Sequence, residues 1–296
     1  MYTRIYKEIL VEKIEIFAPA KVNLALDIIG KKQDGYHEMR MINHSVALFD
    51  TLSFAETEQT NHIFLKTDMQ ESVADQKNLV YETAESIKQI YDIKKGVAIT
   101  LKKGIPMEAG LAGGSSDAAA TIIGLNQLWH LEMTLDDMYA LGKTIGADVP
   151  YCCFKGTALV EGIGEKIRPL TPLPPFKILM IKPEINISTA KAFQAVDQCT
   201  EVYHPDILKI QQVLEQSDFD VLGDCLGNAF EATAFAKYPE LRQIKEKMRA
   251  LGAFASVMSG SGSTIVGYFY KDATLQKAAQ HFKKIKNCHI FLSTVY

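Results

Sequence analysis

Several short stretches of the chain alternate hydrophobic and polar residues, with the period of two that is typical of strands with one buried face. The clearest are residues 22–28, 51–54 and 62–66. A β-branched run at residues 97–101 predicts a further strand, and residues 78–91 show the apolar spacing of a helix. The first part of the chain is therefore expected to mix strands and helices.

A glycine-rich segment, residues 105–116, precedes an alanine-rich run that ends near Trp129. Because alanine has the highest helix propensity, this run predicts a helix. Thr134 has the character of a helix N-cap, and Gly146 lies where the helix after it would end. The glycine-rich segment thus connects a strand to a helix.

Four prolines between residues 169 and 175 mark the clearest joint in the chain, because proline lacks the N–H that helices and ladders use. We place a domain boundary there, with an N-terminal domain of residues 1–168 and a C-terminal domain of residues 169–296. Strands and helices do not alternate strictly, which favours two α+β domains over a doubly wound sheet. Beyond the joint, the pattern predicts a strand at 176–181, helices through Met248 ended by Gly252, strands at 253–258 and 264–270, a helix at 273–285 and a strand at 288–294.

Composition points to an ordinary globular protein of the cytoplasm. Of the 296 residues, 47% are hydrophobic and 23% charged, and the net charge of −3 gives no basic footprint for nucleic acid. No N-terminal apolar stretch resembles a signal peptide, so residues 1–13 are expected to form a frayed tail. The uncharged run 250–270 contains Ser-Gly-Ser-Gly-Ser, which argues against a membrane span.

The cysteines and histidines give no sign of a disulfide framework or of a metal site. The seven histidines are scattered without a metal-binding pair. We therefore expect no protein-bound metal and free thiols in a reducing compartment, at Cys152, Cys153, Cys199, Cys225 and Cys288.

The strongest chemical signal is the glycine-rich segment Ile-Pro-Met-Glu-Ala-Gly-Leu-Ala-Gly-Gly-Ser-Ser-Asp-Ala-Ala-Ala, residues 105–120. Gly110, Gly113 and Gly114 allow a tight backbone path, and Ser115 and Ser116 stand where the helix begins. Free N–H groups at a helix N-terminus suit phosphate. The segment is neither a Walker A motif nor a dinucleotide GxGxxG motif. A plain glycine turn with a serine cap is the alternative.

Two further positions could carry chemistry. Lys21 and Asn23 share strand parity, so both side chains leave one face, and Lys21 could neutralise charge on a transferring phosphoryl group. The alternative is an exposed edge-strand lysine. Asp148, in Gly-Ala-Asp-Val-Pro, could accept a hydroxyl proton, although an aspartate that binds its own turn fits equally well.

Two loops complete the set of motifs. Met-Ser-Gly-Ser-Gly-Ser-Thr, residues 258–264, lies between two apolar strands, and its glycines would permit close approach to the phosphate loop, the name we give to residues 110–116 of the glycine-rich segment. A simple hairpin loop is the alternative. Asp34-Gly35 is a hairpin-turn dipeptide that would present Tyr36 and His37 at a loop tip, where they could contact a base or sugar or simply lie on the surface.

In this order and spacing, the five motifs closely resemble those of the GHMP kinase superfamily, over roughly residues 14–290. The resemblance implies an α+β fold with an N-terminal nucleotide-binding domain, a ferredoxin-like C-terminal domain and an active site in the cleft between them. Asp-Gly-Tyr-His is typical of the branch that transfers the ATP γ-phosphoryl group to the 2-hydroxyl of a cytidine-diphosphate-linked methylerythritol. Homoserine, galactose or mevalonate would be the acceptor in other branches.

The resemblance also implies roles for residues. Lys21 and Asp148 match the catalytic pair, and ATP is the expected donor, accompanied by Mg²⁺. The expected ATP contacts are Asn78, Lys103, Pro106, Gly110, Leu111, Ala112, Gly113, Gly114, Ser115 and Ser116. The expected contacts of the cytidine-diphosphate substrate are Asn23, Tyr36, His37, Ser188 and Phe193. The third motif of the family corresponds to residues 259–263, which we call the third-motif loop, and its expected site residues are Gly260, Ser261 and Gly262. The enzyme is expected to be a monomer or a homodimer.

Two positions depart from the family pattern. Ala112 stands where glycine is usual, and we expect the extra methyl group to be tolerated. Ser263 replaces a proline, which removes some rigidity from the third-motif loop. A kinase of the same superfamily with another small-molecule acceptor, and a nucleotide-binding homologue without catalysis, are the alternative functions.

Overall fold

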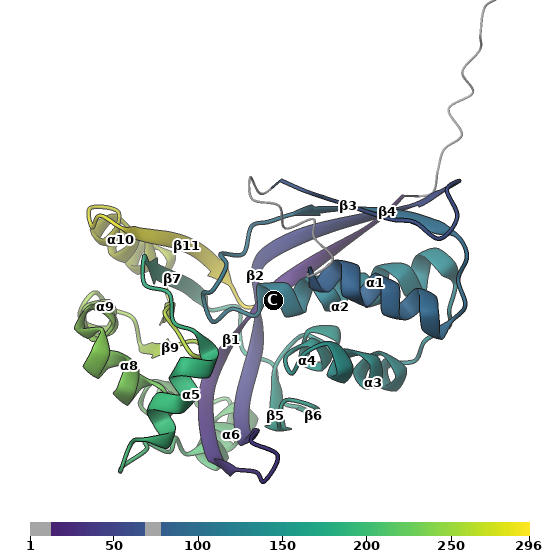
Figure 1. The fold of residues 1–296 in the computed structure, drawn as a ribbon. Helices are drawn as coiled ribbons and strands as arrows, with labels where there is room; N and C mark the ends of the chain where they lie inside the picture. The colour runs from purple at the N-terminus through teal and green to yellow at the C-terminus, as the bar shows by residue number, and fades with distance from the viewer. Residues whose placement is uncertain (1–12, 69–77) are drawn as a thin grey trace, which may run out of the picture.

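The computed structural model describes residues 13–68 and 78–296, so the predicted N-terminal tail lies almost wholly outside the described residues. Two sheets with helices packed against them account for most of the fold (Figure 1). Among the described residues, no helix combines the length and apolar character needed to cross a bilayer.

The first sheet is built around a long antiparallel hairpin. In the described chain, seven strands pair in the order β3-β4-β2-β1-β8, and β5 joins β2 to β6. The strands are β1 (Lys13–Lys31), β2 (His37–Thr57), β3 (Ile63–Thr67), β4 (Gly96–Lys102), β5 (Ala158–Gly162), β6 (Lys166–Pro169) and β8 (Gly227–Asn228).

The predicted Asp-Gly turn closes this hairpin. Gly35 has φ +88°, and the Asp34 carboxylate accepts a hydrogen bond from the Tyr36 N–H at 3.1 Å. The Lys32 N–H also donates to the Tyr36 carbonyl at 2.8 Å. Glycine adopts positive φ without a steric penalty, which is why this dipeptide turns the chain so tightly.

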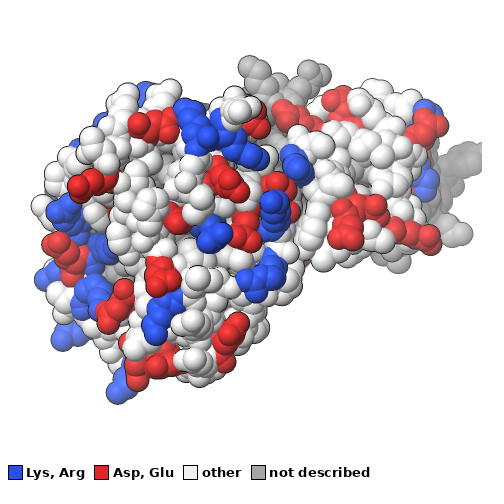
Figure 2. All heavy atoms as spheres, turned by 90° about the horizontal axis from the view of Figure 1, so that it is seen from below, with Lys and Arg blue, Asp and Glu red and all other residues white. Residues whose placement is uncertain are grey.

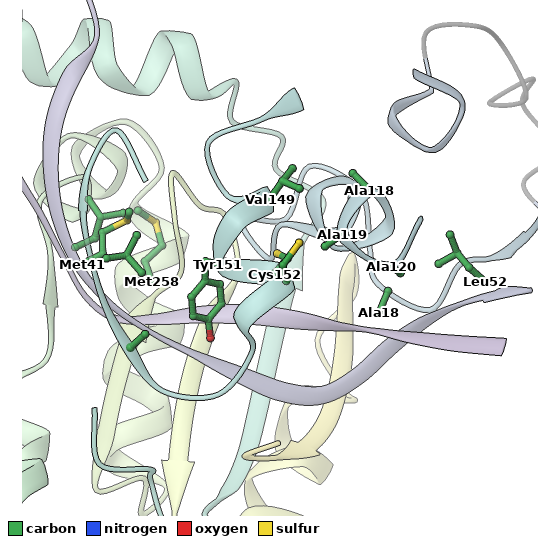
Figure 3. Packing of buried hydrophobic residues seen from close by; sticks show 14 of the residues in the cluster. Ala18, Met41, Leu52, Ala118, Ala119, Ala120, Val149, Tyr151, Cys152 and Met258 are labelled. Carbon is green, nitrogen blue, oxygen red and sulfur yellow. The ribbon is translucent and has the colours of Figure 1, made fainter. Parts of the chain in front are cut away.

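Helices cover one face of the first sheet: α1 (Leu79–Ile90), α2 (Gly113–Trp129), α3 (Leu135–Ile145) and α4 (Val149–Phe154). Small side chains bring α2 close to the sheet, and Figure 3 shows Ala118, Ala119 and Ala120 on α2 near Ala18 of β1. Gly124 fits so tightly that an added Cβ would lie 2.3 Å from the ring of Phe54. This packing fixes the N-terminus of α2 relative to β1.

The second sheet confirms the predicted ferredoxin-like topology. Strands β7 (Lys177–Pro183), β9 (Ala255–Met258), β10 (Ile265–Phe269) and β11 (Cys288–Thr294) pair antiparallel in the order β11-β7-β10-β9. That order is the βαββαβ arrangement. The connecting helices are α5 (Thr189–Asp197), α6 (Ile207–Gln216), α7 (Leu222–Cys225), α8 (Glu231–Lys237), α9 (Pro239–Ala250) and α10 (Asp272–Phe282).

Most elements lie where the sequence predicts them, and Gly252, with φ +97°, follows α9 as expected. The pattern analysis missed the β5–β6 hairpin, helix α4 and the short strand β8. The linker between Pro169 and Lys177 contains no helix or strand. However, β8 from the second half pairs with β1, and the Tyr296 N–H donates to the Ser45 carbonyl at 3.0 Å. The domain boundary after residue 168 therefore stays a prediction.

The surface carries a mixture of both charges (Figure 2), and the cysteines are unpaired with one another. Figure 2 shows acidic and basic residues interspersed over the face seen from below. The five cysteines are free, as predicted, and burial raises the pKa of the Cys153 thiol to about 12.

A buried histidine joins the two sheets. His44 of β2 bonds through Nδ1 to the Ser45 carbonyl at 3.2 Å and through Nε2 to the Tyr268 hydroxyl of β10 at 2.7 Å. Because a carbonyl can only accept, Nδ1 carries the proton and Nε2 accepts from the tyrosine. Burial lowers the pKa of His44 to about 4, although the bond to Ser45 acts in the opposite direction.

This histidine should make the fold sensitive to mild acid. The unfolded chain binds a proton at His44 near pH 6.5 and the folded protein only near pH 4, so stability falls as the pH drops through this window. Between pH 7 and pH 5 we expect the free energy of unfolding to fall by about 2 kcal/mol from this residue. Urea unfolding of the wild type and of His44→Gln at both pH values measures it. An equal pH effect in both proteins would contradict the assignment.

Candidate active site

A cavity of about 710 Å³ lies between the two sheets. Its walls come from β1, β2, the phosphate loop, the start of α4, the start of α5 and the third-motif loop. Fifteen of the predicted site residues line it: Lys21, Asn78, Lys103, Pro106, Gly110, Leu111, Ala112, Gly113, Gly114, Asp148, Ser188, Phe193, Gly260, Ser261 and Gly262.

The glycine-rich segment forms a helix start whose geometry suits an anion. Helix α2 begins at Gly113, and its first helical hydrogen bond runs from the Ser116 N–H to the Ala112 carbonyl at 2.9 Å. The N–H groups of residues 113–115 therefore have no partner within the helix. Together with the positive end of the helix dipole they suit phosphate oxygens. Ala112 adopts φ 55°, the left-handed region that glycine favours, so the methyl group is accommodated at some conformational cost.

The third-motif loop packs directly on the phosphate loop, as the sequence predicts. The Ser259 hydroxyl donates to the Gly110 carbonyl at 2.9 Å, and an added Cβ on Gly110 would lie 2.1 Å from the Ser259 carbonyl oxygen. The Ser263 hydroxyl donates to the Ile185 carbonyl at 2.5 Å. This bond restrains the loop at the position where proline is usual in the family.

Lys103 reaches the cavity from a buried charge cluster that the sequence analysis did not identify. Its ammonium group contacts Asp50 and lies 2.7 Å from Asp117 Oδ2. Burial alone would lower the pKa of Lys103. The attraction of Asp117, and then of Asp50, outweighs this effect and raises the pKa. Burial raises the pKa of Asp117, against the pull of Lys103. Asp50 also accepts the N–H groups of residues 104 and 105, which shapes the start of the loop.

Lys21 and Asp148 meet in the middle of the cavity wall. The Lys21 ammonium lies 3.4 Å from Asp148 Oδ1, with the lysine side chain 5% exposed and the aspartate side chain 32% exposed. The Lys21 N–H donates to the Leu111 carbonyl at 3.1 Å, which fixes the strand to the phosphate loop. The alternative of an exposed edge-strand lysine is wrong, since the Lys21 side chain is buried. The buried ammonium group can stabilise negative charge, and the reachable carboxylate can accept a proton.

Five predicted site residues do not line the main cavity: Asn23, Tyr36, His37, Ser115 and Ser116. The buried Ser116 hydroxyl donates to the Pro19 carbonyl at 2.7 Å. Tyr36 is exposed and lines a smaller cavity of about 160 Å³ together with Gly146 and Ala147. The expectation that His37 is presented at a loop tip is wrong, because its side chain packs against α5 and is 8% exposed.

Asn23 holds Lys21 and the third-motif loop in place through hydrogen bonds. Its Oδ1 accepts from the Lys21 ammonium at 3.3 Å and from the Gly260 N–H at 2.8 Å, while its Nδ2 donates to Asn43 Oδ1 at 2.6 Å. The side chain is fully buried. Asn228 holds the same loop by donating to the Met258 and Gly260 carbonyls. Asn23 therefore connects the lysine to the third-motif loop rather than forming part of the cavity wall.

The cavity continues beyond Lys21 toward the hairpin turn. Its lining there is apolar and comes from both halves of the chain: Leu26, Met39, Met41, Phe193 and Phe230. The cavity thus combines an end formed by the start of α2, a lysine–aspartate pair and an apolar end. This order suits a reaction in which a donor bearing phosphates meets an acceptor at the charged pair.

The sequence comparisons agree with this geometry. Residues 78–156 match the family described as GHMP kinases N terminal domain, and residues 210–286 match GHMP kinases C terminal. A 4-diphosphocytidyl-2-C-methyl-D-erythritol kinase of Bacillus cereus (strain B4264) is 42% identical over 265 residues, which are 90% of this chain and 91% of the relative. The chain belongs to the 4-diphosphocytidyl-2-C-methyl-D-erythritol kinase family of GHMP kinases. It is an ATP-dependent small-molecule kinase.

Other members and solved structures support this family. The 4-diphosphocytidyl-2-C-methyl-D-erythritol kinase of Bacillus anthracis (strain CDC 684 / NRRL 3495) is also 42% identical over 90% of this chain and 91% of its own. A crystal structure of 4-(cytidine 5'-diphospho)-2C-methyl-D-erythritol kinase superposes with TM-score 0.80 at 32% identity, covering 95% of this chain and 99% of the other. A homoserine kinase from Cytophaga hutchinsonii shares the fold at 20% identity, with TM-score 0.75 and coverage of 99% and 98%.

Proposed function

We propose that this GHMP kinase transfers the γ-phosphoryl group of ATP to the 2-hydroxyl of 4-diphosphocytidyl-2-C-methyl-D-erythritol, in the cytoplasmic synthesis of isoprenoid precursors. The observation that carries the proposal is the cavity itself. A helix start that suits phosphate, the Lys21–Asp148 pair and an apolar end line one continuous space, which supports the proposal. The family of the chain supplies the acceptor, since its relatives are named for it.

The chain's own residues suit direct in-line transfer. The N–H groups at the start of α2 bind the ATP phosphates, and Lys103 adds a positive charge beside them. Asp148 accepts the proton of the acceptor hydroxyl as its oxygen attacks the γ-phosphorus. Lys21 stabilises the charge that develops on the transferred group. ADP leaves as the bond between its β-phosphate oxygen and the γ-phosphorus breaks.

Magnesium enters this proposal as the ion that ATP carries. Within residues 13–68 and 78–296, no group of three or more His, Cys, Asp or Glu side chains is arranged to hold a metal. One carboxylate still fits: Asp117 lines the cavity beside the phosphate loop, and its buried Oδ1 has no hydrogen-bond partner among the described residues. Mg²⁺ prefers oxygen ligands and is commonly held by one or two carboxylates plus substrate phosphates. When bound, it would neutralise phosphate charge.

A substrate panel tests the proposal. Purified protein is given ATP with the cytidine-diphosphate methylerythritol, or with homoserine, galactose or mevalonate, and ADP release is followed. We expect turnover with the cytidine substrate alone. Turnover with another acceptor would retain the kinase chemistry and reject the proposed substrate. ATP binding without turnover of any acceptor would favour a nucleotide-binding homologue that lacks catalysis.

A further inference from the structure

We infer that Asp197 is a positioning residue for the acceptor, because it ties helix α5, one wall of the cavity, to the β1–β2 hairpin. We call the four residues Lys31, His37, Phe193 and Asp197 the clamp. Two ion pairs and a ring stack connect them, and Phe193 also meets Phe230. The clamp joins the two halves of the chain near the far end of the cavity from the phosphate loop.

A single carboxylate bridges both strands of the hairpin. Asp197, the last residue of α5, accepts from the Lys31 ammonium at 2.5 Å through Oδ2 and from His37 Nε2 at 2.6 Å through Oδ1. Lys31 and His37 face each other as a cross-strand pair. The hydrogen bonds of Lys31 and then of His37 lower the pKa of Asp197, so the group that binds them is an ionised carboxylate. Charge-assisted hydrogen bonds of this kind are stronger than neutral ones.

An aromatic contact acts beside the carboxylate. The rings of His37 and Phe193 stack at 4.4 Å between centroids, with 16° between their planes. Phe193 precedes Asp197 by four residues, so both leave the same face of α5. Phe193 also meets Phe230 at 5.0 Å in an edge-to-face arrangement. The clamp therefore fixes both the position and the rotation of the helix.

This end of the cavity is the acceptor end. Strand β1 runs from Lys21 beside the phosphate loop to Lys31 at the hairpin turn, a distance of roughly 30 Å at about 3.3 Å per residue. Cavity-lining Leu26 lies between them, and α5 contributes Thr189 and Phe193 to the opposite wall. Loosening α5 should therefore weaken the hold on the part of the acceptor remote from its hydroxyl, and leave ATP binding unchanged.

The inference rests on the proposed function, and enzyme kinetics separate the two. For Asp197→Ala we expect KM for the acceptor to rise about tenfold, with kcat and KM for ATP within about twofold of the wild type, since the clamp contacts do not include Lys21 or Asp148. Lys31→Met should give a smaller rise, and Asp197→Glu should recover part of the loss. The matched control is Asp224→Ala, which removes an exposed carboxylate of the same half that lies 3.9 Å from Arg249. It should leave all three constants unchanged.

Three outcomes would overturn the inference: an unchanged acceptor KM in Asp197→Ala, an equal rise in both KM values, or an equal effect in the control. Hydrogen exchange of the α5 amides gives a second readout that needs no acceptor. We expect faster exchange in residues 189–197 of Asp197→Ala and of Lys31→Met, with no change in α9, and unchanged exchange in α5 would reject the clamp. If Asp197→Ala does not fold, Lys31→Met and Asp197→Asn carry both measurements. A wild type that turns over no cytidine substrate refutes the proposed function instead, and the clamp is then judged by exchange alone.

Discussion

Asp148→Asn is expected to lower kcat by about 10²- to 10⁴-fold while ATP still binds, because an amide cannot accept the hydroxyl proton. The substitution should leave the fold intact. Asp148 precedes α4 as its N-cap but makes no side-chain capping bond, and its side chain is 32% exposed. Steady-state assays of ADP release measure kcat, and calorimetric titration with ATP measures nucleotide binding separately.

A carboxylate elsewhere provides the control for this variant. Asp136 is an exposed residue in the first turn of α3, outside the lining of the cavity. Asp136→Asn should retain turnover within about twofold, as surface substitutions usually do. Near-full activity in Asp148→Asn would show that the proton leaves by another route and that Asp148 is not the base.

Among substitutions that add one methyl group to the phosphate loop, Gly110→Ala should cause the largest loss of stability and activity. Gly110 has φ +73°, which costs a residue with a Cβ about 1–2 kcal/mol. The added Cβ would also lie 2.1 Å from the Ser259 carbonyl oxygen, so one of the two loops must move. We expect a loss of about 3 kcal/mol in unfolding free energy and a fall of about 10²-fold in kcat/KM from the displaced phosphate loop.

Gly114→Ala is the matched comparison, since it adds the same atom to the same loop. The nearest heavy atom to its Cβ would be Leu79 Cδ1 at 3.5 Å, an ordinary contact. Alanine is also the better helix former by about 1 kcal/mol, so stability should hold or rise. Urea unfolding of both variants decides the matter. Equal stability losses would show that the contact between the two loops does not restrain the fold.

The sequence predicted the features whose cause is local. Asp34-Gly35 closes the hairpin because a positive φ and an aspartate cap are encoded within three residues. The start of α2 and its free N–H groups likewise follow from the glycines and alanines around residue 113. The ferredoxin-like order of the second sheet came from family resemblance, and the observed pairing confirms it.

The features that were missed depend on distant pairs. Asp50 shapes the phosphate loop through its bonds to residues 103–105, which lie 53 to 55 positions further along the chain. Nothing near Asp50 in the sequence marks it as a site residue. His37 meets Asp197 across 160 positions, so a residue expected at a loop tip is in fact held against α5. Asn23 was expected at the substrate, but its register on β1 turns it toward Asn43 and Gly260. A pattern of single residues carries no information about such partners.

The pairing of β8 with β1, and of Tyr296 with Ser45, bears on how this enzyme could be recombined with its relatives. A chimera made by joining residues 1–168 to the second half of another GHMP kinase would replace a strand of the first sheet as well as the second sheet. It would also exchange Tyr268, the partner of His44. The halves are therefore not exchangeable modules, and a working chimera would need β8, Tyr268 and the C-terminal residues to be inherited together with β1 and β2.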